Sequence, residues 1–244
     1  MDSNGHSASH RVPLPLDLAW GFGLVALLCG ATGWLTTPPD LFYLLAAALY
    51  LGVCGLVVWS WPETRDFGWA NRATLLRGCL VIVLVALAPF AGHLTDSLWL
   101  YGWMALLALI LDGVDGKVAR ATASESDFGA RFDMELDALF TLGLSIAVLA
   151  LGKAGIWVLA LGLIRYAFVA ASHFADWLNG PLPDSFRRKT VCVWQIVTLL
   201  VAVLPPINTL FASTTLATAL ALLVWSFLVD IHWLYQRRHH HDVH

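Results

Sequence analysis

Residues 111 to 140 read LDGVDGKVARATASESDFGARFDMELDALF, and this stretch decides how the chain folds. At the ends of two apolar runs it carries four acidic residues, Asp112, Asp115, Asp133 and Asp137. A spacing of three or four residues places the two acids of each pair on one face of a helix. The polar segment ATASESDF between the runs can reverse the chain. We therefore expect two antiparallel helices whose acidic faces meet at one surface.

The rest of the chain predicts that these helices lie in a membrane. Of its 244 residues, 59% are hydrophobic and only 13% are charged, whereas a soluble domain has about 25% charged residues. A spanning helix needs about 20 mostly apolar residues, and the sequence offers about eight such runs. The expected fold class is an all-α, polytopic membrane helical bundle. The expected spans are Leu18–Leu35, Leu41–Trp59, Ala73–Ala91, Leu98–Leu111, Leu136–Leu151, Ile156–Phe174, Val191–Leu204 and Leu216–Leu234.

Three of these runs, the fourth, fifth and seventh, are short because polar residues continue the helices beyond them. The placement of Lys and Arg predicts the orientation, since cytoplasmic loops carry an excess of both. If the amino terminus is cytoplasmic, Lys153 lies on the opposite side of the membrane and Arg77 and Arg165 lie inside spans. All the other Lys and Arg residues then lie on the cytoplasmic side. We expect both termini and the acidic site at the cytoplasmic face. The sequence shows no basic surface interleaved with aromatic residues, so we do not expect it to bind nucleic acid.

The acids themselves predict a metal site. Oxygen ligands without His or Cys suit hard divalent cations such as Mg²⁺ or Mn²⁺. Four clustered carboxylates repel one another strongly without a cation, and they could hold one ion or two ions about 3.5–4 Å apart. Gly116, Ala119 and Gly129 leave the same faces free of bulk, and Arg120 offers a planar cation for phosphate oxygens. Together these residues predict a substrate that contains a diphosphate.

The acidic stretch resembles the signature of the CDP-alcohol phosphotransferases, which are membrane enzymes of phospholipid synthesis. That signature is D-x2-D-G-x2-A-R-x8-G-x3-D-x3-D, and residues 112 to 137 meet every specified position. NRATLLR, residues 71 to 77, is similar to the start of the family's first core helix, where Asn71, Thr74 and Arg77 match commonly polar positions. SFRRKTVCVWQ, from residue 185, is more loosely similar to the entrance of the fifth core helix.

The resemblance implies a domain organisation. A six-helix CDP-alcohol phosphotransferase core would cover residues 71–238, preceded by a two-helix membrane extension at residues 17–60. Residues 1–16 would form a cytoplasmic segment and residues 239–244 a tail. The resemblance is also consistent with a homodimer.

Roles for the signature residues also follow from the resemblance. Asp112, Asp115 and Asp133 would bind the metal, and Asp137, also near a metal, would be the general base. The nucleotide and its diphosphate would be bound by Asp112, Gly116, Ala119, Arg120 and Gly129. The implied reaction transfers a phosphatidyl group from CDP-diacylglycerol to a hydroxyl acceptor and releases CMP. The alternative within the family transfers phosphocholine or phosphoethanolamine from a CDP-alcohol to diacylglycerol, and the shared signature does not decide between them.

Other interpretations of the charged residues remain open. The aspartates could pair with Lys117, Arg120 and Arg131 at a membrane surface, and Arg120 alone could anchor a helix end. A transporter with an Asp relay would spread its ionisable groups along a path, whereas these acids cluster at one face. Glu135, beside the site, is read as a solvated charge.

Acceptor binding has its own candidates. Arg165 would contact a phosphate, or it would pair with a carboxylate of another helix. A basic run next to a later span would mark the cytoplasmic face and could also receive an anionic acceptor. This run consists of Arg187, Arg188 and Lys189.

Overall fold

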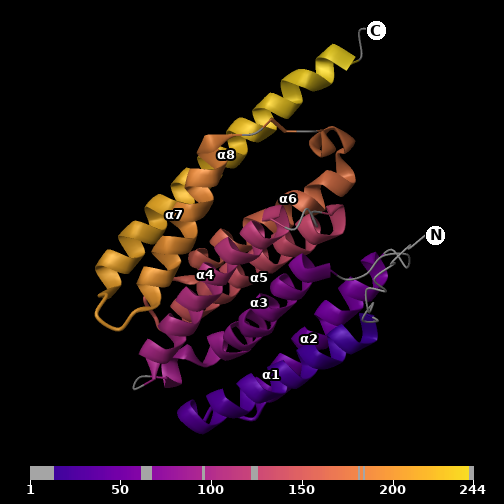
Figure 1. Ribbon diagram of the computed structural model, residues 1–244. Helices are drawn as coiled ribbons and strands as arrows, with labels where there is room; N and C mark the ends of the chain where they lie inside the picture. Colours follow the sequence, from indigo (N-terminus) through magenta and orange to yellow (C-terminus); the bar gives the residue numbers. More distant parts are fainter. Residues whose placement is uncertain are drawn as a thin grey trace, which may run out of the picture.

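The computed structural model describes residues 14–61, 68–94, 97–121, 126–180, 182–183 and 185–241. The side chains of residues 70, 115–121, 127, 176, 179 and 238–241 lie outside this description. Within the described residues the fold is all-α and contains no strand, which confirms the predicted fold class. The helices, shown in Figure 1, are α1 (Leu14–Thr36), α2 (Leu41–Ser60), α3 (Gly68–Leu87), α4 (Leu98–Ala121), α5 (Asp127–Ala150), α6 (Leu159–Phe174), α7 (Phe186–Val203) and α8 (Thr209–His241).

Among the residues that the structure describes, five stretches are long and apolar enough to cross a membrane. They comprise α1, α2, α6, most of α8, and α3 together with the 3-10 turn that continues it to His93. The other three helices, α4, α5 and α7, are those whose apolar runs the sequence makes short. Polar residues lengthen α4 and α5 to 24 residues each, so both helices project their charged ends beyond the apolar part of the bundle.

Helix α3 is the centre of the bundle. Helices α1, α2, α4 and α5 all pack against it, and Figure 1 shows it running between the amino-terminal pair and the later helices. Beyond Arg77 it reads GCLVIVLVAL, apolar on every side, which is typical of a helix enclosed by others. The side chains from Cys79 to Leu87 are accordingly buried.

The amino-terminal pair, α1 and α2, covers one side of α3. Asp17 of α1 forms an ion pair with Arg72 of α3 at 2.8 Å, and both side chains are largely buried. The outward surface of the pair is apolar. Trp34 and Trp59, close to helix ends, are 84% and 85% exposed, as expected of aromatic residues at a bilayer boundary.

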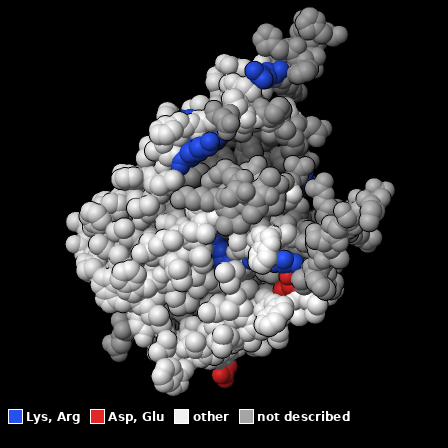
Figure 2. Space-filling view, viewed as in Figure 1, with Lys and Arg blue, Asp and Glu red and all other residues white. Residues whose placement is uncertain are grey.

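Helices α7 and α8 form an antiparallel pair beside α5, and α8 extends beyond the other helices in Figure 1. Arg187, near the start of α7, holds Asp230 of α8 at 2.5 Å. The face in Figure 2 shows few charged side chains, consistent with a surface that contacts lipid.

Candidate metal and substrate site

Three helices bring the site together at one end of the bundle. Asp112 comes from the carboxyl-terminal part of α4, and Asp133 and Asp137 come from the second and third turns of α5. Ser126 fixes where α5 begins, because its Oγ accepts a hydrogen bond from the Gly129 amide at 3.0 Å. Both helices pack against α3, so their acids converge over one face of that helix.

The three carboxylates form a group that could hold a metal ion. One oxygen from each of Asp112, Asp133 and Asp137 lies within 4.8 Å of the other two. The carboxylates are between 37% and 43% exposed, so an ion can reach them from solvent. Three oxygen donors at this separation fit a hard divalent cation, to which water and substrate oxygens would add further ligands. The predicted meeting of the two acidic faces is thus seen for these three residues.

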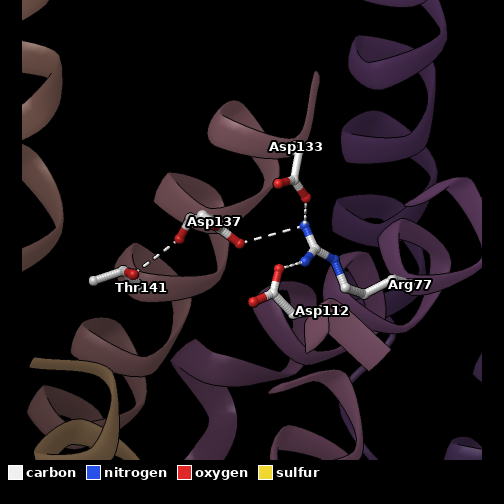
Figure 3. Close-up of polar contacts among 5 residues, drawn as sticks. All are labelled: Arg77, Asp112, Asp133, Asp137 and Thr141. Atoms are coloured by element: carbon white, nitrogen blue, oxygen red, sulfur yellow. Dashed lines mark hydrogen bonds and ion pairs between the residues drawn. The ribbon is translucent and has the colours of Figure 1, made fainter. Parts of the chain in front are cut away.

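The structure adds a residue to which the sequence gave no role. The guanidinium of Arg77, on α3, lies among the three carboxylates (Figure 3). Its Nη1 donates to Asp112, and its Nη2 lies 2.6 Å from Asp133 and 3.3 Å from Asp137. The acids therefore do pair with a base, which is Arg77; the side chains of Lys117 and Arg120, named in the sequence alternative, lie outside the described residues. Arg77 stood out only as a polar position in an apolar helix.

Figure 3 also shows a contact of Asp137 that leaves its carboxylate untouched. The Thr141 hydroxyl donates to the backbone carbonyl of Asp137 at 2.8 Å. Such a bond within one helix constrains the local backbone. Of the three acids, Asp137 lies farthest from the guanidinium, with its Oδ1 3.3 Å from Arg77 Nη2.

Gly129 has a packing role that the sequence did not reveal. A Cβ at this position would lie 2.8 Å from Oδ1 of Asn71 on α3 and 3.1 Å from the Ser126 Oγ. The absent side chain therefore lets the first turn of α5 approach α3 closely. Asn71 is itself buried, so two residues singled out from separate motifs lie together at this contact.

The remaining signature residues are placed only in part. Asp115, Gly116, Ala119 and Arg120 all belong to α4, which places them on the last turns of the same helix as Asp112. Their side chains lie outside the described residues. Their roles in holding metal and diphosphate stay predictions.

The basic residues proposed for the acceptor make contacts within the protein. Arg165 donates to Glu135 of α5 at 2.7 Å, which realises the interhelical pairing that the sequence left open and shows that Glu135 is not simply solvated. Arg187 and Arg188 both approach Asp230, at 2.5 Å and 3.6 Å. Lys189 is exposed on the same turn of α7. A binding role for these residues stays a prediction.

Two adjoining cavities separate α2 from α5. The first, about 450 Å³, begins at Trp61 and Arg131 near the level of the acids. The second, about 520 Å³, continues along α2 to Leu45 and Leu139 and is bounded by Tyr166 of α6. Both cavities are lined by Leu56, Phe132 and Glu135.

A sequence model of a known family matches residues 67–227, which include every residue of the acidic site. The family is described as CDP-alcohol phosphatidyltransferase. The chain belongs to this family. The match leaves α1 and α2 outside it, and the division of the chain into a two-helix extension and a six-helix core stays a prediction.

The chain is similar in sequence to several characterised or named proteins. It is 32% identical over 130 residues to human ethanolaminephosphotransferase 1, a match that covers 48% of this chain and 32% of that protein. It is 27% identical over 160 residues to a putative cardiolipin synthase of Mycobacterium tuberculosis, covering 64% of this chain and 77% of that protein. With the CDP-diacylglycerol–serine O-phosphatidyltransferase of Helicobacter pylori it shares 33% identity over 106 residues, covering 37% and 44% of the two chains. No solved structure matches.

These similarities place the acidic site within the family's shared region. The CDP-alcohol phosphatidyltransferase match begins just before α3 and ends within α8. Arg77 and its three carboxylates therefore lie within the matched region. The cavities, by contrast, have one wall formed by α2, which lies outside the match.

Proposed function

We propose that the protein transfers a phosphatidyl group from CDP-diacylglycerol to a hydroxyl acceptor and releases CMP, in a reaction that requires a divalent metal ion. Glycerol 3-phosphate, inositol phosphate and serine are the acceptors to test. The observation that carries this proposal is the convergence of Asp112, Asp133 and Asp137 within 4.8 Å, in a member of this family. The similarity to the CDP-diacylglycerol–serine O-phosphatidyltransferase of Helicobacter pylori, 33% identical over 106 residues, supports CDP-diacylglycerol as the donor.

In this proposal Asp112, Asp133 and Asp137 hold the ion, together with Asp115 from the same face of α4. Bound there, Mg²⁺ or Mn²⁺ would neutralise charge on the diphosphate, the main source of catalysis in phosphoryl transfer. Arg120 would add a second positive charge near the phosphates, from the last turn of α4.

The protein's own acid would handle the proton. Asp137 takes the proton from the acceptor hydroxyl, whose oxygen attacks the phosphorus joined to the diacylglycerol. The bond between that phosphorus and the bridging oxygen breaks, and CMP leaves with the electron pair. Asp137 suits this role because Arg77 approaches its carboxylate less closely, at 3.3 Å, than it approaches Asp133, at 2.6 Å. An acid held less tightly by a cation is the better proton acceptor.

The two cavities along α2 would take an acyl chain of the lipid. They run from Trp61 to Leu45, and 16 residues of helix at 1.5 Å each rise about 24 Å. This exceeds half of the roughly 30 Å hydrocarbon thickness and so accommodates one leaflet's chain. Arg131 at the outer end adds a positive charge near a lipid phosphate. The cavity wall from α2 would give the extension a part in substrate binding.

The alternative is transfer of phosphocholine or phosphoethanolamine from a CDP-alcohol to diacylglycerol, which the similarity to human ethanolaminephosphotransferase 1 favours. Both reactions use a diacylated lipid and release CMP, so they are separated by their donors. Purified protein with Mn²⁺ or Mg²⁺ would be given CDP-diacylglycerol with each acceptor, or CDP-choline or CDP-ethanolamine with diacylglycerol. CMP release with only the first donor supports the proposal, and release with only the second supports the alternative. Release with neither, from folded protein, contradicts both.

A further inference from the structure

Arg77 lies deeper in the bundle than the acids that it contacts. Its side chain is 2% exposed, whereas those of Asp112, Asp133 and Asp137 are 37%, 41% and 43% exposed. The guanidinium therefore contacts the carboxylates from the inner side and leaves their other side open to solvent. One planar cation bridges acids from two helices that both pack on its own helix (Figure 3).

The protein leaves Arg77 little room to withdraw. A cavity of about 10 Å³ adjoins it, between Val81, Phe140 and the two acids Asp112 and Asp137. That volume holds about one water molecule, which is far smaller than a guanidinium group. An ion that binds the carboxylates from the open side must therefore do so with Arg77 still beside them.

We propose that Arg77 and the divalent ion compete for the carboxylates of Asp112, Asp133 and Asp137. An ion such as Mg²⁺ at the same group needs carboxylate oxygens at about 2.0–2.1 Å, and its two positive charges repel a guanidinium that already contacts all three acids. Arg77 thus holds the acids together before the ion arrives and lowers the affinity of the site for it. The ion then binds reversibly, and it replaces some of the contacts between Arg77 and the carboxylates.

This inference rests on the metal dependence of the proposed function, but its test needs no turnover. A contrary role is conceivable, in which Arg77 orients the acids and strengthens metal binding. The two roles predict opposite changes when the charge is removed. Competition predicts tighter metal binding by a variant without the charge, whereas orientation predicts weaker binding.

The test measures Mn²⁺ binding to detergent-purified full-length protein without nucleotide, from the electron paramagnetic resonance signal of free Mn²⁺. We expect Arg77→Gln to lower the dissociation constant by about tenfold or more, the factor that 1.4 kcal/mol represents. Without Mn²⁺ the same variant has a lower melting temperature than the wild type, because its carboxylates repel one another. Saturating Mn²⁺ therefore raises the melting temperature of the variant more than that of the wild type.

Two controls make the result specific. Arg72→Gln removes an arginine from the same helix that pairs with Asp17, away from the acids, and should leave the Mn²⁺ affinity unchanged. Asp133→Asn should weaken Mn²⁺ binding, which verifies that the ion is at this site. If Arg77→Gln does not fold, Arg77→Met is used instead, because it also lacks the charge; this variant should likewise bind Mn²⁺ more tightly than the wild type.

Unchanged or weaker Mn²⁺ binding by a folded Arg77 variant overturns the inference, as does the absence of Mn²⁺ binding by both the wild type and the variant. Failure of the proposed reaction is seen separately. Wild-type protein that binds Mn²⁺ yet releases no CMP from any donor would sink the assigned reaction and leave the competition between Arg77 and the ion standing.

Discussion

At the scale of single residues, the three acids of the site are distinguished by their distance from one guanidinium. Asp112 and Asp133 make hydrogen bonds with Arg77, and Asp137 approaches it only at 3.3 Å. Removing Asp137 should therefore disturb the arrangement of the site least while removing the proposed proton acceptor. This difference gives the assignment of roles a direct test.

We expect Asp137→Asn to lower the rate of CMP release by about 10²–10⁴-fold, the usual contribution of a general base. Binding of a cytidine nucleotide, measured by isothermal titration calorimetry, should persist. Asp133→Asn is the matched variant on the same face of α5, and it should lose Mn²⁺ affinity as well as activity. Substantial residual transfer by Asp137→Asn would show that another group accepts the proton.

Gly129 permits a second prediction at this scale. Gly129→Ala places a methyl group 2.8 Å from Asn71 Oδ1, so α3 and α5 must separate or Asn71 must move. Overpacking of this kind costs about 1–3 kcal/mol, which should appear as a lower melting temperature and reduced CMP release. Gly113→Ala on α4 has open space around the new Cβ and should be neutral or slightly stabilising. Equal stability of the two variants would contradict the packing role.

The acids could be predicted from the sequence because their spacing is local. Asp133 and Asp137 are one helical turn apart, and any helix through them presents both on one face. Arg77 could not be assigned in this way, because it lies 35 positions before Asp112 and its contact depends on how α3 is enclosed. The Arg165–Glu135 pair could not be predicted for the same reason. The sequence indicated that Arg165 needs a partner, but the partner depends on how the helices pack.

At the scale of elements, hydropathy located the eight α-helices of the described part of the chain but not the cavities between them. The polar ends of α4 and α5 were predictable because apolar runs stop short of the acids. The cavities along α2 were not, since they arise from how α2 is set against α5 and α6. Their proposed use by an acyl chain makes α2 a functional element as well as a cover for α3.

A pair of glycines on α2 tests that use. Gly52 lines the second cavity, whereas Gly55, one turn later, does not, and both have open space around an added Cβ. Gly52→Phe should fill the cavity and raise the KM for a long-chain lipid substrate severalfold, with kcat little changed. Gly55→Phe should leave both constants unchanged, and a short-chain lipid should be affected by neither variant. Equal KM values for all three proteins would exclude this cavity from substrate binding.

At the scale of the whole molecule, the distribution of charge separates the two ends of the bundle. The acids, Arg187 and Arg188 gather at one end, where α3, α5 and α7 begin. At the other end Lys153 follows α5, and its ammonium donates to the Leu204 carbonyl at 2.5 Å. Burial lowers the pKa of Lys153, which disfavours its charged form. This single base therefore counts little against the several basic residues at the other end when the orientation is predicted. Positive residues favour the cytoplasm, and we therefore expect the site to face it.

Cysteine labelling in intact cells tests this orientation. In a variant whose four native cysteines are replaced by alanine, a single cysteine is introduced at Ile156 or at Phe186, which are 76% and 85% exposed at opposite ends of the bundle. The positive-inside rule predicts that a membrane-impermeant maleimide labels Ile156→Cys from outside and Phe186→Cys only after permeabilisation. The reverse pattern would place the acids outside the cytoplasm, away from any cytoplasmic supply of the CDP-linked donor. Because the site lies at the same end as Phe186, this measurement bears on the proposed reaction as well as on the topology.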